Sequence, residues 1–393
     1  MPDAMAALAE IYHDRAQPTR AWKAAGGRVV GYFCDHFPVE LVAAAGFLPV
    51  RVSGDPAYDR EIERKYITPL IPKTFAGVRQ SGLEFVNSMA ARLIGGQYGD
   101  LDFLVISASR KPIMNLFTQL LAAKEAYPND VRLPPIHILD HAHVPADSAR
   151  AFNERSLLAL KAKLEVWSGC EITEAALSAG ITEGNTGRAL ARRLAALRSA
   201  NPPKISGADF LTAVGAGMFM PRGQHNARLE ALLNDPPDEA RLGLRVFVGG
   251  SPADNLQLYS AIEAQDATVV AEDHCWGERC ADLPIGLEGG ALAGSIRRWQ
   301  TAPPCGLRFP LEASPKDCVA RAKTARADCA ILSVYRGDEM QVWDTPQEVE
   351  ALEAAGVPTL HLRDQAYAVD APALAESLSR FFGAVRSREG ALS

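Results

Sequence analysis

Residues 28–52 read RVVGYFCDHFPVELVAAAGFLPVRV. The first six, 28–33, form a short apolar run of the length of a buried strand. Pro38 suits the first turn of a helix, where its missing N–H costs nothing, and Gly46 suits the position after the helix, where positive φ is common. Residues 47–52 then predict a second strand. The stretch therefore predicts a strand–helix–strand unit.

The same alternation recurs on both sides of a long helical middle. Further strands are expected at 101–107, 134–139, 245–250, 267–271, 328–334 and 358–362, and helices at 4–24, 75–94 and 112–126. Strands alternating with helices indicate an α/β fold whose parallel sheets are covered on both faces. The predicted parts are an N-terminal helix (1–25), a first α/β domain (26–146), a helical connector (147–240) and a second α/β domain (241–393).

Composition excludes several classes of function. The 393 residues contain 41 Lys and Arg against 47 Asp and Glu, and no basic block marks a nucleic-acid surface. No apolar run approaches the roughly 20 residues of a membrane span. Residues 1–20 lack the continuous apolar core of a secretory signal, so we expect a cytoplasmic protein. The seven cysteines are odd in number and irregularly spaced, which favours thiols over a disulfide framework.

A family resemblance rests on an ordered set of motifs. Residues 31–51 contain a P-x-E-L run at 38–41, followed by Ala44-Ala45-Gly46 and Pro49. Later motifs are GCEIT at 169–173 with Asn185 and Arg188, PPKISG at 202–207, FMP at 219–221 and VVAEDHCWGER at 269–279. Over residues 28–365 this set resembles the 2-hydroxyacyl-CoA dehydratase and benzoyl-CoA reductase family, in particular the dehydratase D-component.

The resemblance implies a fold and a chemistry. It implies two flavodoxin-like α/β domains, a pairing of similar subunits, and a four-iron four-sulfur cluster held by three cysteines. It also implies an ATP-dependent activator that supplies an electron, and an acyl-CoA thioester that receives the electron from the cluster. Thiolates serve as ligands because iron–sulfur clusters require soft anionic sulfur.

The three implied ligand positions hold no cysteine in this chain. They fall in TPLIPKT at 68–74, SASRK at 107–111 and YRGD at 335–338. Hydroxyl, guanidinium and ammonium groups cannot replace thiolates on iron. We therefore expect no metal or cofactor in this chain and place the cluster in a related partner subunit. An alternative ligand set is Cys34 with Cys275 and Cys280, although such cysteines are also common as small buried apolar residues.

Two groups of residues are candidates for a site. Cys34, His36 and Glu40 lie around the turn before the first helix and suit acid–base chemistry at a thioester. Glu40 also has a purely structural explanation, because a carboxylate near a helix N-terminus is stabilising. The second group is expected to bind substrate, its cations holding a carboxylate or a CoA phosphate. Its members are Ser107, Ser109, Arg110, Lys111 and Arg336.

Three functions remain open at this point. The first is a subunit of an acyl-CoA dehydratase or benzoyl-CoA reductase-like complex, pairing with a cluster-bearing homologue. The second is a stand-alone enzyme that acts on acyl-CoA without iron–sulfur chemistry. The third is a non-catalytic scaffold protein. In each case we expect no nucleic-acid or membrane partner.

Overall fold

The computed structural model divides into two compact units. Unit 1 comprises Met1–Arg188, Ala216–Arg228 and Leu283–Ala302, and unit 2 comprises Ala189–Gly215, Leu229–Asp282 and Pro303–Ser393. The structure describes residues 4–34, 37–70, 84–98, 101–108, 111–142, 144, 146–236, 241–301 and 312–390.

Unit 1 is built on a four-stranded parallel sheet. Its strands are β1 (Arg28–Tyr32), β2 (Phe47–Arg51), β3 (Phe103–Ser107) and β4 (Ile136–Leu139). They lie in the order β2-β1-β3-β4, so β2 and β4 are the edges. The register pairs Arg28 with Phe47 and Leu104 with Ile136.

Both faces of this sheet carry an apolar core. Val105 of β3 packs with Leu41, Leu160 and Ile181. Its neighbours Leu104 and Ile106 belong to a second core with Met89 and Leu116. Successive strand residues point to opposite faces, so one short apolar run supplies both layers.

The helices of unit 1 follow from this two-sided burial. They are α1 (Ala4–His13), α2 (Gln17–Ala24), α3 (Val39–Ala44), α4 (Arg60–Ile62), α5 (Glu84–Ile94), α6 (Lys111–Ala126), α7 (Asp147–Ser168) and α12 (Ala291–Thr301). A π-helical turn at Glu63–Ile67 and a 3₁₀ turn at Thr68–Leu70 follow α4. Leu41 of α3 and Leu160 of α7 contribute to one core, and Met89 of α5 and Leu116 of α6 to the other.

Three further helices come from the middle of the chain: α8 (Glu174–Ser199), α9 (Gly207–Ala216) and α10 (Arg222–Asn234). Ile181 of α8 is fully buried in the core of unit 1. Among the residues described between 147 and 236, no strand interrupts these helices, as the sequence indicates.

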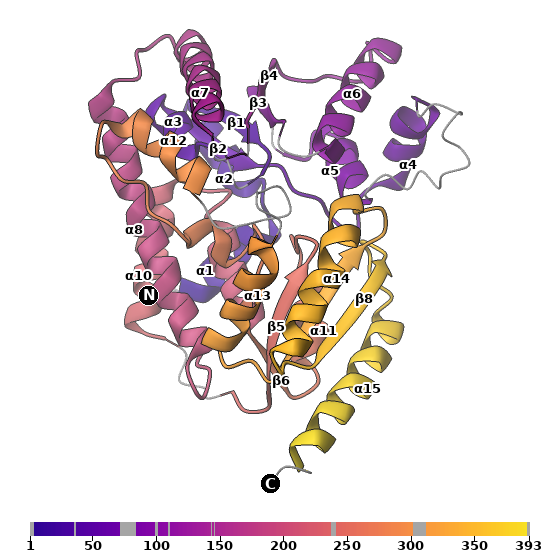
Figure 1. Ribbon diagram of the computed structural model, residues 1–393. Coiled ribbons are helices and arrows are strands. Elements are labelled where there is room, and N and C mark those ends of the chain that lie inside the picture. The colour runs from indigo at the N-terminus through magenta and orange to yellow at the C-terminus, as the bar shows by residue number, and fades with distance from the viewer. Residues whose placement is uncertain are drawn as a thin grey trace. The chain divides into compact units, whose positions relative to one another are not determined.

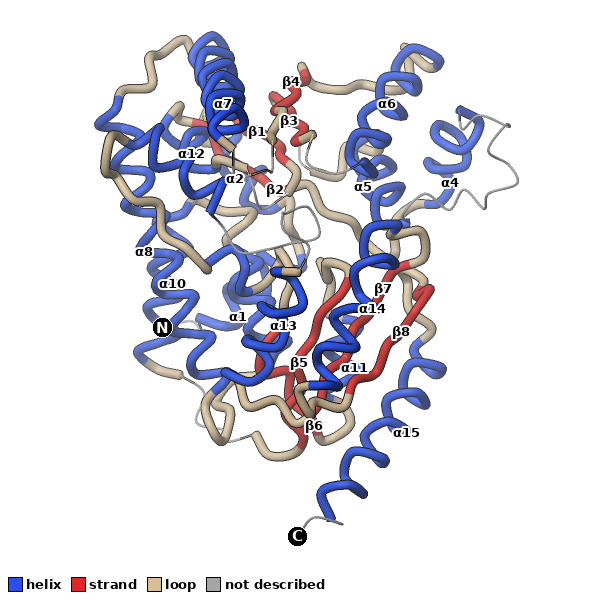
Figure 2. Tube along the Cα trace, viewed as in Figure 1, coloured by secondary structure: helices blue, strands red, loops and turns tan. Residues whose placement is uncertain are grey.

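Unit 2 repeats the sheet topology. Its strands β5 (Leu244–Gly250), β6 (Ala267–Glu272), β7 (Cys329–Tyr335) and β8 (Thr359–Gln365) are all parallel and lie in the order β6-β5-β7-β8 (Figure 2). The helices are α11 (Gln257–Glu263), α13 (Ala313–Thr324), α14 (Glu339–Ala354) and α15 (Ala371–Gly390), with a 3₁₀ turn at Glu278–Ala281. Figure 1 shows α13 and α14 against the sheet, where Cys318 and Leu352 join its core.

The α/β prediction is confirmed: two parallel sheets of the same strand order are consistent with two flavodoxin-like domains. All eight expected strands occur, with ends shifted by three residues or fewer. The single helix expected over 4–24 is wrong. Gln17–Ala24 starts a new helix with Pro18 in its first turn, where a proline lacks the N–H that a continuous helix would need. Of the helix expected at 75–94, residues 84–94 are helical and the preceding ones lie outside the described residues.

No helix in the described part of the chain is both long enough and apolar enough to cross a bilayer.

Candidate functional site

Several of the predicted site residues fall outside the described part of the chain. His36, Ser109 and Arg110 are not described, and Lys111 is described only through the backbone that begins α6. Their expected roles therefore stay predictions. The described candidates are Cys34, Glu40, Ser107 and Arg336, and the alternative cluster ligands are also described.

Cys34 and Ser107 follow neighbouring strands. Cys34 lies just beyond β1, is partly buried, and has a φ of 72°. Ser107 ends β3, is almost fully buried, and its Oγ has no hydrogen-bond partner among the described residues. Because β1 and β3 are parallel neighbours, both residues lie at the carboxyl edge of the sheet. That edge is where ligands bind in open α/β sheets.

Arg336 lies in unit 2, directly after β7. Its Nε donates to the two carboxylate oxygens of Asp364 at 3.1 and 3.2 Å. The side chain is 36% exposed and that of Asp364 is 69% exposed. An exposed pair of this kind contributes little to stability, so Arg336 can exchange Asp364 for another anion at small cost.

Glu40 is the best-defined of the candidates. It lies in the first turn of α3, where the side chain is 5% exposed, and it forms an ion pair with Nη2 of Arg188 on α8. Nη1 of Arg188 donates to Oδ1 of Asn185 at 3.0 Å. Asn185 in turn exchanges two hydrogen bonds of 2.9 Å with the backbone of Ile285. Glu40 is thus the inner end of a polar chain that ties three separate segments of unit 1 together.

The ion pair decides the protonation state of Glu40. Burial on its own would raise the pKa of this carboxyl. The guanidinium groups of Arg188, Arg298 and Arg222 outweigh burial, and the pKa is lowered below its usual value. Glu40 is therefore a carboxylate at neutral pH, suited to accepting hydrogen bonds rather than to donating a proton.

Three glycines of α8 allow this close approach. A Cβ at Gly184 would lie 2.6 Å from Oε1 of Glu40, and one at Gly180 would lie 3.3 Å from its backbone oxygen. A Cβ at Gly187 would lie 2.6 Å from Oδ1 of Asn226 on α10. The spacing of 180, 184 and 187 places all three on one face of α8. This face lets α3 and α10 pack directly on the backbone of α8.

A cavity of about 510 Å³ lies beside edge strand β2, entirely within unit 1. Its volume falls in the range of small-molecule sites. The lining comes from α2, β1, α3, β2, α8, the first turn of α10 and the segment that leads into it. It consists of Trp22, Tyr32, Val39, Glu40, Ala43, Gly46, Phe47, Leu48, Pro49, Gly180, Glu183, Gly184, Gly217, Met220, Pro221, Arg222, Gly223 and Gln224.

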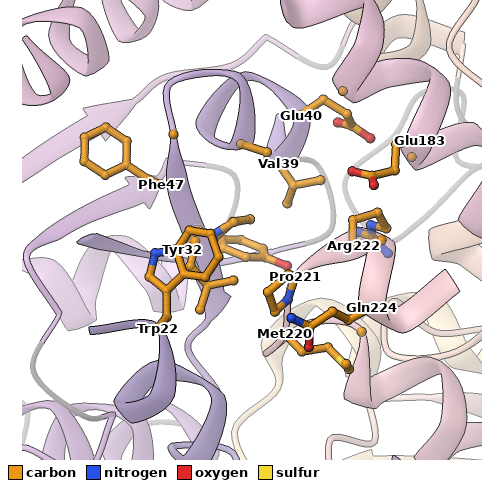
Figure 3. Close-up of a pocket in the computed structure, with 18 residues that line it drawn as sticks. Trp22, Tyr32, Val39, Glu40, Phe47, Glu183, Met220, Pro221, Arg222 and Gln224 are labelled. Atoms are coloured by element: carbon orange, nitrogen blue, oxygen red, sulfur yellow. The ribbon is translucent and has the colours of Figure 1, made fainter. Parts of the chain in front are cut away.

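The cavity has a polar end and an apolar end. Figure 3 shows the carboxylates of Glu40 and Glu183 gathered near Arg222, while the rings of Trp22 and Tyr32 lie together on the other side. Sequence reasoning found Glu40 but missed Glu183 and Arg222. The α8 glycines at helical spacing were the available signal, because such a stripe indicates a closely packed helix face.

The alternative cluster ligands are divided between the two units. Cys34 belongs to unit 1, whereas Cys275 and Cys280 belong to unit 2, in the stretch after β6. Ion pairs hold that stretch: Arg198 pairs with Glu278 at 2.5 Å and also with Glu272. Within the described ranges, no three His, Cys, Asp or Glu side chains are grouped so as to hold a metal. Residues 107–108 and 335–338, which are described parts of the implied ligand positions, offer no thiolate for the cluster that the resemblance implies.

Comparison with known families supplies the wider relation. The family described as "2-hydroxyglutaryl-CoA dehydratase, D-component" matches residues 34–381, which include strands of both sheets. The chain belongs to this family. The resemblance inferred from the motifs is confirmed.

Three relatives indicate the range of the family. The beta subunit of lactoyl-CoA dehydratase from Anaerotignum propionicum is 23% identical over 365 residues, which cover 90% of this chain and 92% of the relative. The beta subunit of (R)-2-hydroxyglutaryl-CoA dehydratase from Acidaminococcus fermentans is 25% identical over 285 residues, 70% of each chain. A benzoyl-CoA reductase subunit from Thauera aromatica is 25% identical over 285 residues, 69% of this chain and 68% of the relative. All three are named as subunits of enzymes that act on acyl-CoA or aryl-CoA.

Proposed function

We propose that this chain is a subunit of a complex that acts on an acyl-CoA thioester, and that it carries no iron–sulfur cluster of its own. The cluster lies in a related partner subunit, and an ATP-dependent activator supplies electrons to it. The chain contributes part of the substrate pocket and of the subunit interface.

The observation that carries this proposal is the replacement of all three expected ligand cysteines in a chain that otherwise matches the family across both units. Two of the replacements are described. The second stretch begins with Ser107 at the end of β3, and the third runs from Tyr335 at the end of β7 to Asp338. The hydroxyl and guanidinium groups of these stretches cannot replace thiolates on iron.

The basic residues beside these positions suggest what the chain does instead. Arg110 and Lys111 follow Ser107 in sequence, and Arg336 follows Tyr335. Guanidinium groups bind carboxylate and phosphate through paired hydrogen bonds. We assign these three residues to the anionic part of the substrate, a CoA phosphate or an acyl carboxylate.

Calorimetry with benzoyl-CoA tests the assignment, on the chain alone and on its complex with a related subunit. Arg110→Ala is expected to weaken binding by about 1.5–3 kcal/mol, the range for a hydrogen bond to a charged group. Arg132→Ala is the matched control, because Arg132 is exposed and lies in the same unit. Equal affinity in the two variants removes Arg110 from the site. Absence of acyl-CoA binding in both samples contradicts the proposed function.

A second candidate is a stand-alone enzyme that uses Cys34, His36 and Glu40. The cavity beside Glu40 favours it. Because its pKa is lowered, Glu40 would hold or orient a group in such an enzyme rather than give up a proton. Turnover of an acyl-CoA by the purified chain in air would establish this candidate. Activity that requires a partner subunit and a reductant would exclude it.

A further inference from the structure

The cavity beside β2 has a deep apolar part. Tyr32, Leu48 and Met220 are each at least 95% buried and line it together with the partly buried Trp22 and Val39. Tyr32 is held in place by stacking on Phe37, with ring centroids 4.6 Å apart. A preformed apolar wall of this kind favours an apolar ligand group, because burial of apolar surface is favourable.

The mouth of the cavity already carries negative charge. Glu183 is exposed, and its Oε1 lies 2.7 Å from the place that a Cβ at Gly223 would take, so its carboxylate rests against the first turn of α10. This is the favourable end of the helix dipole for a carboxylate. Glu40 adds a second, buried carboxylate, whose partner Arg188 is engaged by it.

A ligand that is itself acidic would meet these two carboxylates. Arg222 is the cation that lines the cavity, and it faces both of them (Figure 3). An additional carboxylate would compete with Glu183 for the N-terminus of α10 and would be repelled by Glu40. In a partly buried site, repulsion between like charges is strong, and we expect it to weaken the binding of an acidic ligand tenfold or more. A neutral hydroxyl or carbonyl group would meet hydrogen-bond acceptors and a donor there without that repulsion.

We propose that this cavity is the acyl subsite of the chain and that it selects an uncharged, apolar acyl group over an acidic one. This inference rests on the proposed function, because it presumes that a CoA thioester binds. The apolar group occupies the space beside Tyr32 and Met220, and the polar end faces Glu183 and Arg222.

The test compares four probes by calorimetry: CoA, benzoyl-CoA, lactoyl-CoA and (R)-2-hydroxyglutaryl-CoA. The sample is the full chain with its partner subunit. Benzoyl-CoA is expected to bind at least about tenfold more tightly than CoA, and lactoyl-CoA between the two. (R)-2-hydroxyglutaryl-CoA is expected to bind no more tightly than CoA, because its additional carboxylate is repelled.

Two variants link the preference to the cavity. Ala43 is exposed on α3 and lines the cavity, so a tryptophan at this position would fill it. Ala43→Trp is expected to abolish the higher affinity for benzoyl-CoA over CoA without lowering the affinity for CoA itself. Ala159→Trp, at an exposed site on α7 of the same unit, is the matched control and is expected to retain the gain. Glu183→Gln is expected to improve (R)-2-hydroxyglutaryl-CoA binding severalfold. Circular dichroism checks that each variant is folded.

The outcomes distinguish a failure of the acyl-subsite inference from a failure of the proposed function. A benzoyl-CoA gain that survives Ala43→Trp in a folded protein overturns the inference. So does equal affinity for the acidic and the apolar esters in the wild-type protein. In both cases CoA still binds, and the proposed function stands. If neither CoA nor any ester binds, the proposed function fails, and the inference fails with it.

Discussion

The buried pair of Glu40 and Arg188 gives the sharpest test of the site geometry. Glu40→Gln removes the negative charge that Arg188, Arg298 and Arg222 all attract, and it leaves the guanidinium of Arg188, 10% exposed, without its counter-charge. Removing one partner of a buried pair costs about 3–5 kcal/mol. Glutamine still accepts one hydrogen bond, and Asn185 still binds Arg188, so we expect about 3 kcal/mol of destabilisation. For a unit of this size that lowers Tm by roughly 6–12 °C.

The pH dependence follows from the lowered pKa of Glu40. Such a carboxyl stabilises the folded state above its unfolded pKa, and this contribution is lost as pH falls through the folded value. The difference between wild type and Glu40→Gln should therefore be constant from pH 5 to 8 and shrink below about pH 4.5. Urea unfolding at pH 7, 5 and 4 measures it. Glu183→Gln, at an exposed carboxylate of the same cavity, serves as control and should change stability by less than about 0.5 kcal/mol. A cost below about 1 kcal/mol for Glu40→Gln at pH 7 would refute the account of the pair.

Two further predictions concern the close packing of Gly184 on Glu40 and the buried carboxyl of Glu348 in unit 2. Gly184→Ala should destabilise by about 1–3 kcal/mol in thermal unfolding, because the new Cβ would lie 2.6 Å from Glu40. Gly383→Ala in α15 has open space and should be neutral or stabilising, so equal effects would contradict the close packing of α8. Burial raises the pKa of Glu348 to about 7, despite a hydrogen bond from Ser314. As pH rises, this glutamate ionises at a lower pH in the unfolded chain than in the folded one, so the free energy of unfolding falls between about pH 4.5 and 7. Glu348→Gln should therefore be more stable than wild type by up to about 3 kcal/mol at pH 8. Urea unfolding measures the difference in free energy of unfolding between Glu348→Gln and wild type, and the same difference at pH 5 and pH 8 would contradict this prediction. Glu353→Gln, at an exposed site on the same helix, is the control.

The strands were predictable because each is a short apolar run with turn residues at its ends. Residues 103–107 are a good example, since Val105 faces one core and Ile106 the other, which requires continuous apolar residues. The break between α1 and α2 was less visible, because alanines continue across it and Pro18 is tolerated in a first helical turn.

The candidate site was only partly predictable. Glu40 stood out as a carboxylate in an otherwise apolar helix, but its partner Arg188 lies 148 residues further along the chain. No local pattern specifies which distant cation compensates a buried carboxylate. The same is true of Asp364, which pairs with Arg336 through the parallel neighbours β7 and β8. Sequence spacing indicated chemistry at the strand ends, whereas the cavity beside edge strand β2 required the packing of α3, α8 and α10.

We propose that this chain lacks a cluster and works with a subunit that has one. Iron and acid-labile sulfide, measured after anaerobic purification of the chain alone and of its complex with a co-expressed related subunit, test it most directly. We expect a colourless, iron-free chain, and a stable heterodimer whose iron and sulfide, about four of each, belong to the partner. Iron and sulfide near four per chain in the isolated protein, lost when Cys34, Cys275 and Cys280 are replaced, would contradict it.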